Sequence, residues 1–250
     1  HRGRRGRGDR AAHRSRKGNR MIELDVEQGS PEWVAARLGI PTASQFHRLI
    51  TPKTRKASSQ SAGYRNELLA EWLFGLPADA AKSGYMDRGG ELEADAAAWY
   101  EMRNDCDTRK LGFALRDDRR VGCSPDRMVG DRGGLEIKCR SAPIHIGYLL
   151  GDADEAYCQV QGCMWVCERE WWDFLAYHPL MPAYSARIER DDAFIAQLEI
   201  AVNLFLEGMD EMKDKLLRLG CEPRPPQITI DAGMESDASS FATEGHVDAA

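Results

Sequence analysis

The chain has 250 residues, of which 42% are hydrophobic, so it is long enough to bury one sizeable core. Residues 1–20 hold nine Lys or Arg against one acid, a charge of +8, and the whole chain carries −6, which leaves −14 for residues 21–250 with histidines neutral. An acidic body of this kind excludes general electrostatic adhesion to DNA. A polyanionic partner would have to be held by locally clustered bases, by metal ions or by enclosure.

The two ends of the chain differ in composition from its middle. Residues 1–20 lie directly before Met21, are basic and lack the apolar region of a signal peptide, so we expect a disordered or non-native leader. A nucleic-acid-binding arm is the alternative. Residues 221–250 are rich in proline, serine, glycine and acid, which predicts a disordered acidic tail. We therefore expect a single domain over 21–220, with a division into two domains as the alternative.

Between these ends the sequence predicts both helices and strands. Apolar periodicity predicts helices over 31–38, 64–74, 89–103, 153–168 and 191–219, with a shorter apolar run, FHRLI, after Ser44. Residues 53–63, KTRKASSQSAG, indicate a mobile loop. Strands are expected over 111–116, 120–129, 134–139, 172–178 and 184–189. The chain is therefore expected to be of the mixed α/β class.

The cysteine pattern indicates a reducing environment. Seven cysteines are an odd number at irregular positions, which fits the cytoplasm better than a disulfide scaffold. Cys158, Cys163 and Cys167 follow C-x4-C-x3-C, which is not the spacing of a zinc site. We interpret them as small core residues, with an iron–sulfur or zinc site as the alternative. No run of 18 apolar residues occurs, so we expect no membrane span.

The stretch SPDRMVGDRGGLEIKCR (124–140) predicts a β-hairpin around a glycine-rich turn. If Asp126 and Glu136 lie on its two strands, the pairing centre falls at position 131 within the turn, and the two carboxylates face each other. Opposed Cβ atoms lie about 5 Å apart, so the two charges repel unless a cation lies between them. Alternation sends Glu136 and Lys138 to one face, while Ile137 points into the core.

This hairpin has the composition of a divalent-metal site. The carboxylates of Asp126 and Glu136 and the carbonyl of Ile137 are oxygen ligands, which suit Mg2+ or Mn2+ completed by water. Lys138 beside them could stabilise developing negative charge and orient or deprotonate a nucleophile, as phosphodiester cleavage requires. The alternative is an ordinary charged hairpin whose acids pair with neighbouring arginines: Arg127, Arg132 or Arg140.

Two polar residues in otherwise apolar helices could belong to the same site. Glu93 shares a helical face with Ala97 and Tyr100, so it is expected among inward-packing residues, although a solvated glutamate is the alternative. Gln159 lies in the apolar run YCQVQGCMWVCE. It could bond a metal-bound water or a catalytic side chain; a buried glutamine bonded to backbone is the alternative.

A phosphate seat is predicted near the N-terminus. Thr42 and Ser44 precede the apolar run FHRLI, and Arg37 lies shortly before them. Hydroxyls, a guanidinium and the first amides of a helix together bind a phosphate well. The alternative is that Ser44 only caps its helix.

The order and spacing of several motifs resemble the YqaJ-like viral recombinase family of the lambda exonuclease type, within the PD-(D/E)xK nuclease superfamily. The resemblance covers about residues 28–219. It is carried by the following stretches: GSPEWVAARLGIPTAS (29–44), GGELEADA (89–96), CSPDRMV (123–129), GLEIKC (134–139), QVQGCMWV (159–166) and DEMKDKL (210–216). The fold that it implies is a central mixed β-sheet flanked by helices, a restriction-endonuclease-like PD-(D/E)xK core.

The resemblance also implies a function. It implies an Mg2+-dependent exonuclease that processively degrades one strand of linear double-stranded DNA, 5′ to 3′, from a 5′-phosphorylated end. The product is a 3′ single-stranded overhang for recombination by strand annealing. The enzyme would be a homotrimeric ring around DNA ends, in the cytoplasm of a bacterial or phage-infected cell, with a single-strand annealing protein as partner. Enclosure would explain how an acidic body holds DNA.

Roles for individual residues are implied in the same way. Asp126, Glu136 and the Ile137 carbonyl would bind metal, Lys138 would act on the nucleophilic water, and Gln159 would support the centre. Glu93 would help to place a second Mg2+, with Mn2+ as a substitute. The 5′-phosphate would be held by Arg37, Thr42 and Ser44, Met86 would be a strand-separating wedge, and Asp117 or Asp118 would be a further functional acid.

Two other functions remain as alternatives. One is a structure-specific endonuclease or nickase of the same superfamily. The other is a catalytically silent DNA-binding subunit, against which the mutually repelling acids argue. Cleavage of closed circular DNA would distinguish the endonuclease from the exonuclease.

Overall fold

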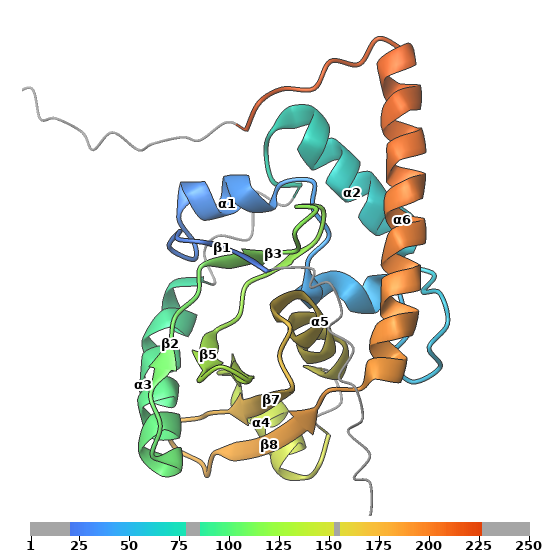
Figure 1. Cartoon of the computed structure of the whole chain (residues 1–250). Helices are drawn as coiled ribbons and strands as arrows, with labels where there is room; N and C mark the ends of the chain where they lie inside the picture. The colour runs from blue at the N-terminus through green and yellow to red at the C-terminus, as the bar shows by residue number, and fades with distance from the viewer. Residues whose placement is uncertain (1–20, 79–85, 153–155, 227–250) are drawn as a thin grey trace, which may run out of the picture.

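The computed structural model describes residues 21–78, 86–152 and 156–226, with the backbone alone for residues 86–91 (Figure 1). The helices are α1 (Pro31–Arg37), the 3-10 helix η1 (Ala43–Arg48), α2 (Ser61–Phe74), α3 (Met86–Asn104), α4 (Ala142–Leu149), α5 (Tyr157–Cys167) and α6 (Asp192–Arg218). The strands are β1 (Ile22–Leu24), β2 (Thr108–Arg109), β3 (Phe113–Leu115), β4 (Gly122–Cys123), β5 (Arg127–Val129), β6 (Gly133–Lys138), β7 (Trp171–Ala176) and β8 (Tyr184–Glu189).

The main sheet has five strands in the order β2-β5-β6-β7-β8. Neighbouring strands are antiparallel except β6 and β7, which run parallel and are joined through α4 and α5. A parallel pair needs a crossover of this kind, because a hairpin can join only antiparallel strands. A second sheet has the order β1-β3-β4. The predicted mixed sheet flanked by helices is confirmed.

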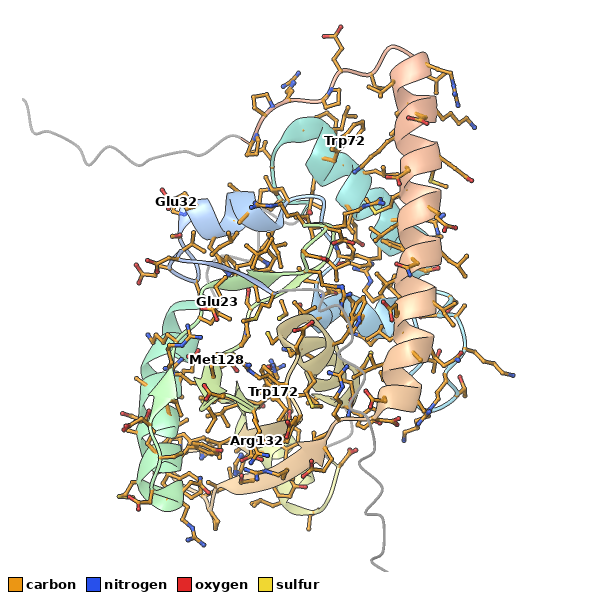
Figure 2. All side chains as sticks on the ribbon, in the orientation of Figure 1. Glu23, Glu32, Trp72, Met128, Arg132 and Trp172 are labelled. Atoms are coloured by element: carbon orange, nitrogen blue, oxygen red, sulfur yellow. The ribbon has the colours of Figure 1, made fainter. Side chains whose placement is uncertain are left out.

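Helices cover both faces of the main sheet (Figure 1). On one face α5 is buried along most of its length and packs with η1, α2 and α6 in the larger core, to which the fully buried Met128 and Trp172 of the sheet contribute (Figure 2). On the other face α3 brings Ala96, Ala97 and Tyr100 against Leu135 and Ile137. Because strand residues alternate, Ile137 lies toward α3 and its neighbours in sequence lie toward α5.

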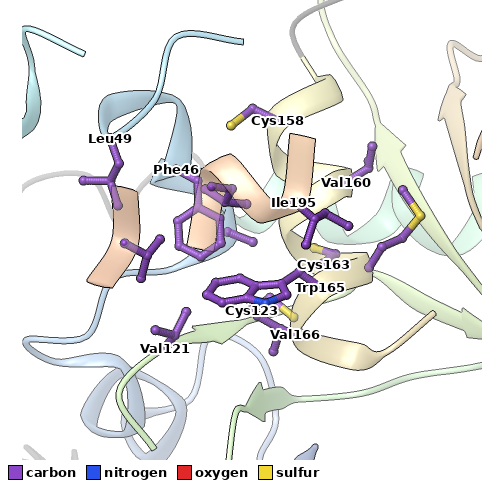
Figure 3. Close-up of a cluster of buried hydrophobic side chains, with 14 of the residues drawn as sticks. Phe46, Leu49, Val121, Cys123, Cys158, Val160, Cys163, Trp165, Val166 and Ile195 are labelled. Atoms are coloured by element: carbon purple, nitrogen blue, oxygen red, sulfur yellow. The ribbon is translucent and has the colours of Figure 1, made fainter. Parts of the chain in front are cut away.

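The three cysteines of the C-x4-C-x3-C run lie in the larger core, as predicted. Cys158, Cys163 and Cys167 are all buried, and the Sγ atoms of Cys123 and Cys167 lie 3.4 Å apart. Figure 3 shows Cys123 near the ring of Trp165, which is tilted against the ring of Phe46. Burial raises the pKa of Cys158 to about 12, so it packs as a neutral thiol. Within the described residues, no three His, Cys, Asp or Glu side chains form a metal-binding cluster.

The structure differs from the sequence-based prediction at one expected strand and at three elements that were not predicted. The strand expected over 120–129 is two strands, β4 and β5, which belong to different sheets. The chain changes sheet at Ser124 and Pro125, since proline cannot donate to a central ladder. Helix α4 and the short strands β1 and β2 were not predicted. The short strands are held by pairing with distant partners, β3 and β5, which local periodicity does not reveal.

The predictions for the two ends fall mainly outside the described residues. Residues 1–20 and 227–250 are not described. Of the predicted tail, residues 221–226 run back over α2, where the Arg224 amide donates to the Leu73 carbonyl at 2.9 Å. Among the helices that the structure describes, none is both long and apolar enough to cross a membrane.

Candidate active site

The β5–β6 hairpin has the register that the sequence predicts. Arg127 pairs with Leu135 and Val129 with Gly133, so one step further along the ladder Asp126 lies opposite Glu136. Asp126 Oδ2 accepts a hydrogen bond of 2.6 Å from the Ile137 amide, which fixes this carboxylate at the end of the ladder. The amide and carbonyl of one strand residue project to the same side, so the Ile137 carbonyl also faces the Asp126 strand.

Glu136 is the centre of the site. It is 1% exposed, and its Oε1 accepts from Lys138 Nζ and, at 2.7 Å, from Gln159 Nε2 of α5. Its Oε2 is buried and has no hydrogen-bond partner in the part of the chain that the structure describes. The structure therefore brings together Asp126, Glu136, Lys138 and Gln159 from the hairpin and α5.

The electrostatics of this cluster favour a cation. Burial and then the charge of Glu136 raise the pKa of Asp126 well above its usual value. Burial alone would lower the pKa of Lys138, but the charges of Glu136 and Asp126 raise it to about 12, so the amine is held as an ammonium. One lysine cannot neutralise both the buried carboxylate of Glu136 and the half-buried carboxylate of Asp126, so a further cation would stabilise the pair.

Glu93 of α3 is joined to the site by Arg127, a contact that the sequence did not predict. Arg127 is buried, and its Nη1 donates to Glu93 Oε1 and to the Asp126 carbonyl, both at 2.6 Å. The predicted inward face of the helix is confirmed, because Ala97 and Tyr100 are buried on it. The signal in the sequence was Arg127, which lies between Asp126 and the apolar residues of the strand. Burial of a guanidinium there requires an acid from another element.

Arg132, a second arginine considered as a partner of the hairpin acids, forms its ion pair away from the site. Arg132, labelled in Figure 2, lies in the hairpin turn and pairs with the exposed Glu170 at 3.3 Å. Arg127 pairs with Glu93, so neither arginine neutralises the two opposed carboxylates. The third alternative, Arg140, lies near enough for its charge to lower the pKa of Lys138, but it forms no ion pair with either acid among the described residues.

The residues of the predicted phosphate seat gather around Tyr64. Its hydroxyl accepts from the Thr42 amide at 3.2 Å, Thr42 Oγ1 lies 3.3 Å from Ser44 Oγ, and Tyr64 acts electrostatically on Arg37. Burial lowers the pKa of Arg37, and its Nε is buried without a hydrogen-bond partner among the described residues. A desolvated guanidinium with an unpartnered N–H group is suited to an anion.

The alternative explanation of Ser44, as a cap of its helix, is wrong. Ser44 does not cap its helix, because η1 begins at Ala43 and its N-cap is Thr42, whose side chain makes no capping bond. The helix is also a six-residue 3-10 turn instead of an α-helix, so it supplies little dipole. The seat therefore depends on side chains more than on helix amides.

Trp33 and Ser124 are further residues near this seat that sequence reasoning missed. The Arg37 guanidinium carbon lies 3.9 Å from the centre of the Trp33 ring, and Trp33 Nε1 donates to Ser124 Oγ at 2.9 Å. Arg37 and Trp33 are four residues apart on α1, a spacing that places side chains on one helical face and could have been recognised in the sequence.

Three remaining candidates are not joined to the cluster by any described contact. Met86 begins α3, but its side chain lies outside the described residues. Asp117 and Asp118 lie in the exposed turn between β3 and β4, where Asp117 Oδ1 accepts from the Asp118 amide and Asp118 Oδ1 accepts from the Arg120 amide, each at 2.9 Å. Both acids therefore have a structural explanation as turn residues.

The residues of the cluster fit an oxygen-coordinated divalent ion. The unpartnered Glu136 Oε2, the Asp126 carboxylate and the Ile137 carbonyl are all hard oxygen donors. They are two side chains and one backbone group, so water would have to complete the coordination, as Mg2+ commonly requires. Glu93 could join only if it shared its carboxylate with Arg127.

A mixed sheet with a crossover helix pair, carrying two opposed acids and a lysine on one hairpin, defines the restriction-endonuclease-like PD-(D/E)xK fold. Residues 32–170 match the YqaJ-like viral recombinase domain, which is more than half of the chain. The chain belongs to this family, as its motifs indicated.

Solved structures give the same result. An alkaline exonuclease from Laribacter hongkongensis, LHK-Exo, is 35% identical with a TM-score of 0.68, and the match covers 76% of this chain and 98% of that one. The same protein in complex with dAMP gives 34% and 0.69 over the same shares. A phage-related exonuclease from Haemophilus somnus 129PT, 17% identical with a TM-score of 0.56 over 71% and 96% of the two chains, shares the fold. None of the curated proteins compared with the chain matches it.

Proposed function

We propose that this protein is an Mg2+-dependent deoxyribonuclease that degrades one strand of linear double-stranded DNA processively, 5′ to 3′, from a 5′-phosphorylated end. The observation that carries the proposal is the cluster around Glu136, where one buried carboxylate accepts from Lys138 and Gln159 and keeps a second oxygen for a cation. The name of the Laribacter protein, an alkaline exonuclease, supports the same reaction class.

The chain's own residues divide the work of hydrolysis. The Asp126 and Glu136 carboxylates and the Ile137 carbonyl would hold Mg2+, or Mn2+ as a substitute, and Glu93 would help to hold a second ion. Bound there, the metal would act as a Lewis acid on the phosphate and lower the pKa of a coordinated water. Gln159 holds Glu136 Oε1 in place, and the Ile137 amide holds Asp126, so neither carboxylate needs to reorganise.

Lys138 would act on the reacting groups directly. Its ammonium lies against Glu136 and has two further N–H donors, which can stabilise negative charge on the phosphate oxygens and orient the attacking water. The attacking water must lose its proton, and a lysine can take it only after giving up its own. The neighbouring carboxylates raise the pKa of Lys138 to about 12, so the residue is an ammonium, which can stabilise negative charge but cannot accept a proton.

The preference for ends rests on the second group of residues. Arg37, Thr42 and Ser44 would seat the terminal 5′-phosphate, Met86 would separate the last base pair, and the product would be a 3′ single-stranded overhang. A homotrimeric ring would enclose the duplex and let an acidic protein remain on DNA. A single-strand annealing protein in the same bacterial or phage-infected cytoplasm would take over the overhang.

The test uses three forms of one duplex in Mg2+. The full-length protein is incubated with linear DNA that has 5′-phosphates, with linear DNA that has 5′-hydroxyls and with a covalently closed circle. One strand of each linear duplex is labelled, at one end or the other. We expect loss of label from the 5′-phosphorylated end first, slower attack on 5′-hydroxyl ends and no change in the circle. Cleavage of the circle would favour a structure-specific endonuclease or nickase instead, and a monomeric mass in solution would contradict the ring.

A further inference from the structure

Trp33 occupies a position between the phosphate seat and the metal hairpin. It lies in the first turn of α1, where Ser30 Oγ caps the helix by accepting from the Trp33 amide at 3.2 Å. Arg37 ends the same short helix one turn later, on the same face. The capped helix therefore fixes the indole relative to the guanidinium.

The flat face of Trp33 carries Arg37. The guanidinium carbon lies 3.9 Å from the ring centre, which is a cation–π contact, and Arg37 Nε is buried without a hydrogen-bond partner among the described residues. A stacked guanidinium can move only in the plane of the ring, so its remaining N–H groups keep a set direction. The ring stabilises the cation but leaves those donors for an anion.

The edge of the same indole reaches the strand connection that leads to Asp126. Trp33 Nε1 donates to Ser124 Oγ at 2.9 Å and to the Gly112 carbonyl at 3.1 Å. Because Ser124 Oγ accepts from the indole, its own hydroxyl proton is left to donate elsewhere. Ser124 lies two residues before Asp126, so a single side chain links the two parts of the site.

We propose that Trp33 is a positioning residue for recognition of the 5′-phosphate, holding the Arg37 guanidinium against its face and the Ser124 hydroxyl at its edge in one rigid frame. The inference rests on the proposed function, and it adds Ser124 as a further donor to the phosphate. A phosphate bound by both groups lies at a set distance from the metal hairpin. Because the frame is rigid, binding of the 5′-phosphate also aligns the scissile bond with the metal hairpin.

Two substitutions separate the two contacts. Trp33→Phe keeps an aromatic face for Arg37 and removes the N–H bond to Ser124, and Trp33→Leu removes both. Trp171→Leu is the matched control, because Trp171 carries Arg187 in a similar stack, 3.7 Å from ring centre to guanidinium carbon, on β7 and β8. For each protein kcat and KM are measured on linear duplexes with 5′-phosphate and with 5′-hydroxyl ends, and thermal unfolding verifies the fold.

The readout is the ratio of kcat/KM for phosphorylated ends to that for hydroxyl ends. We expect Trp33→Leu to lower this ratio about tenfold, because it removes a partly desolvated cation–π contact. Trp33→Phe should lower the ratio less. The ratio for Trp171→Leu should stay unchanged. If Trp33→Leu does not fold, a lowered ratio for Trp33→Phe still supports the proposal and an unchanged one overturns it.

Equal losses on both kinds of end, or an equal fall in the ratio for Trp171→Leu, would also overturn the positioning role. Failure of the proposed function looks different. In that case the wild-type protein itself would not distinguish the two ends, or would show no nuclease activity at all.

Discussion

Glu136 is a buried carboxylate and Asp126, opposite it on the adjacent strand, is a half-buried one. Among the described residues, the ammonium of Lys138 forms the ion pair with Glu136. Burial of like charges is costly, and their arrangement is retained in the structure by specific donors: Gln159 and Lys138 for Glu136, and the Ile137 amide for Asp126. We therefore expect this preorganised cation site to lower the stability of the metal-free protein.

The first prediction concerns Asp126→Asn. Burial and Glu136 raise the pKa of Asp126, so its ionised form destabilises the fold as pH rises above the unfolded value of about 3.9. Asparagine keeps the acceptor for the Ile137 amide without the charge. The metal-free variant should therefore melt higher than wild type at pH 8, by about 2–4 °C per kcal/mol recovered.

The same experiment measures metal binding. Mg2+ should raise the Tm of the wild-type protein, because a ligand of the folded state stabilises it by about 2.7 kcal/mol at a hundred times its Kd. It should hardly raise that of Asp126→Asn. Asp214→Asn, an exposed acid on α6, is the control and should respond as wild type does. A normal Mg2+ response in Asp126→Asn would remove this residue from the metal site.

The second prediction concerns Lys138→Ala. Without the ammonium, charge on the phosphate is no longer stabilised, so cleavage of labelled linear duplex should fall at least about a hundredfold. Binding of DNA, measured by fluorescence anisotropy with Ca2+ in place of Mg2+, should be largely retained because the phosphate seat is intact. Retained cleavage would mean that Lys138 has no part in the chemistry.

At the scale of elements, the position of Gln159 depends on how α5 packs. This helix runs between the sheet and η1, and it approaches η1 closely because Gly162 has no side chain. A Cβ at Gly162 would lie 2.5 Å from Cδ2 of the fully buried Phe46. The same contact therefore sets the distance between the helix that carries Gln159 and the short helix beside the phosphate seat.

Gly162→Ala should destabilise the protein by about 1–3 kcal/mol, measured by urea unfolding, because an added methyl group forces the Phe46 ring to move. Gly147→Ala, in α4, is the matched control: its Cβ would meet only Asp152 Cβ at 4.0 Å, and alanine should stabilise that helix by about 0.5–1 kcal/mol. If Gly162→Ala were neutral as well, α5 would not be held by close contact with η1.

A further element-scale prediction concerns Asp191, the N-cap of α6. Its carboxylate accepts from the Phe194 amide at 2.8 Å and also binds Tyr157 and Arg55, so it joins α6, α5 and the loop before α2. The Phe194 amide is the main cause of its lowered pKa, partly opposed by burial. An acid with a lowered folded pKa stabilises the fold above its unfolded pKa, and this contribution is lost as pH falls through the folded value.

Asp191→Ala should therefore cost about 1 kcal/mol at pH 7. The difference in unfolding free energy from wild type should shrink as the pH falls below about 3.9 and the wild-type carboxylate becomes protonated. Urea titrations between neutral and acidic pH measure both. A difference that did not change with pH would assign the effect to lost packing and not to the charged cap.

At the scale of the whole molecule, the net charge bears on how the protein would remain bound to DNA. Residues 21–250 carry −14, so the proposed enclosure of DNA, with bases confined to a channel, must replace the counterion release that open DNA-binding proteins use. We expect the length degraded in one binding event, measured with excess heparin as a trap, to change little between about 50 and 200 mM salt. An open protein with six to ten phosphate contacts would lose about 10³–10⁵ in affinity over that range. A run length that collapsed with salt would contradict enclosure.

The sequence by itself determined the parts of the molecule that are encoded in neighbouring residues. Helical periodicity located α1, α2, α3, α5 and α6, and alternation around a glycine-rich turn placed Asp126 opposite Glu136 and Lys138 beside it. These follow from backbone geometry, because a helix repeats every 3.6 residues and a strand every two. The motif order was also sufficient to indicate the family that residues 32–170 match.

Only the tertiary structure decided which distant side chains meet. Arg127 pairs with Glu93 across 34 residues of sequence, and Trp33 bonds Ser124 across 91. No local pattern encodes these contacts or the division of 120–129 between two sheets. The physical reason is that a buried polar group must find a partner wherever the packing of elements brings one within reach. The hairpin supplies the opposed acids, and the packing of α1, α3 and α5 around it places the groups that orient them.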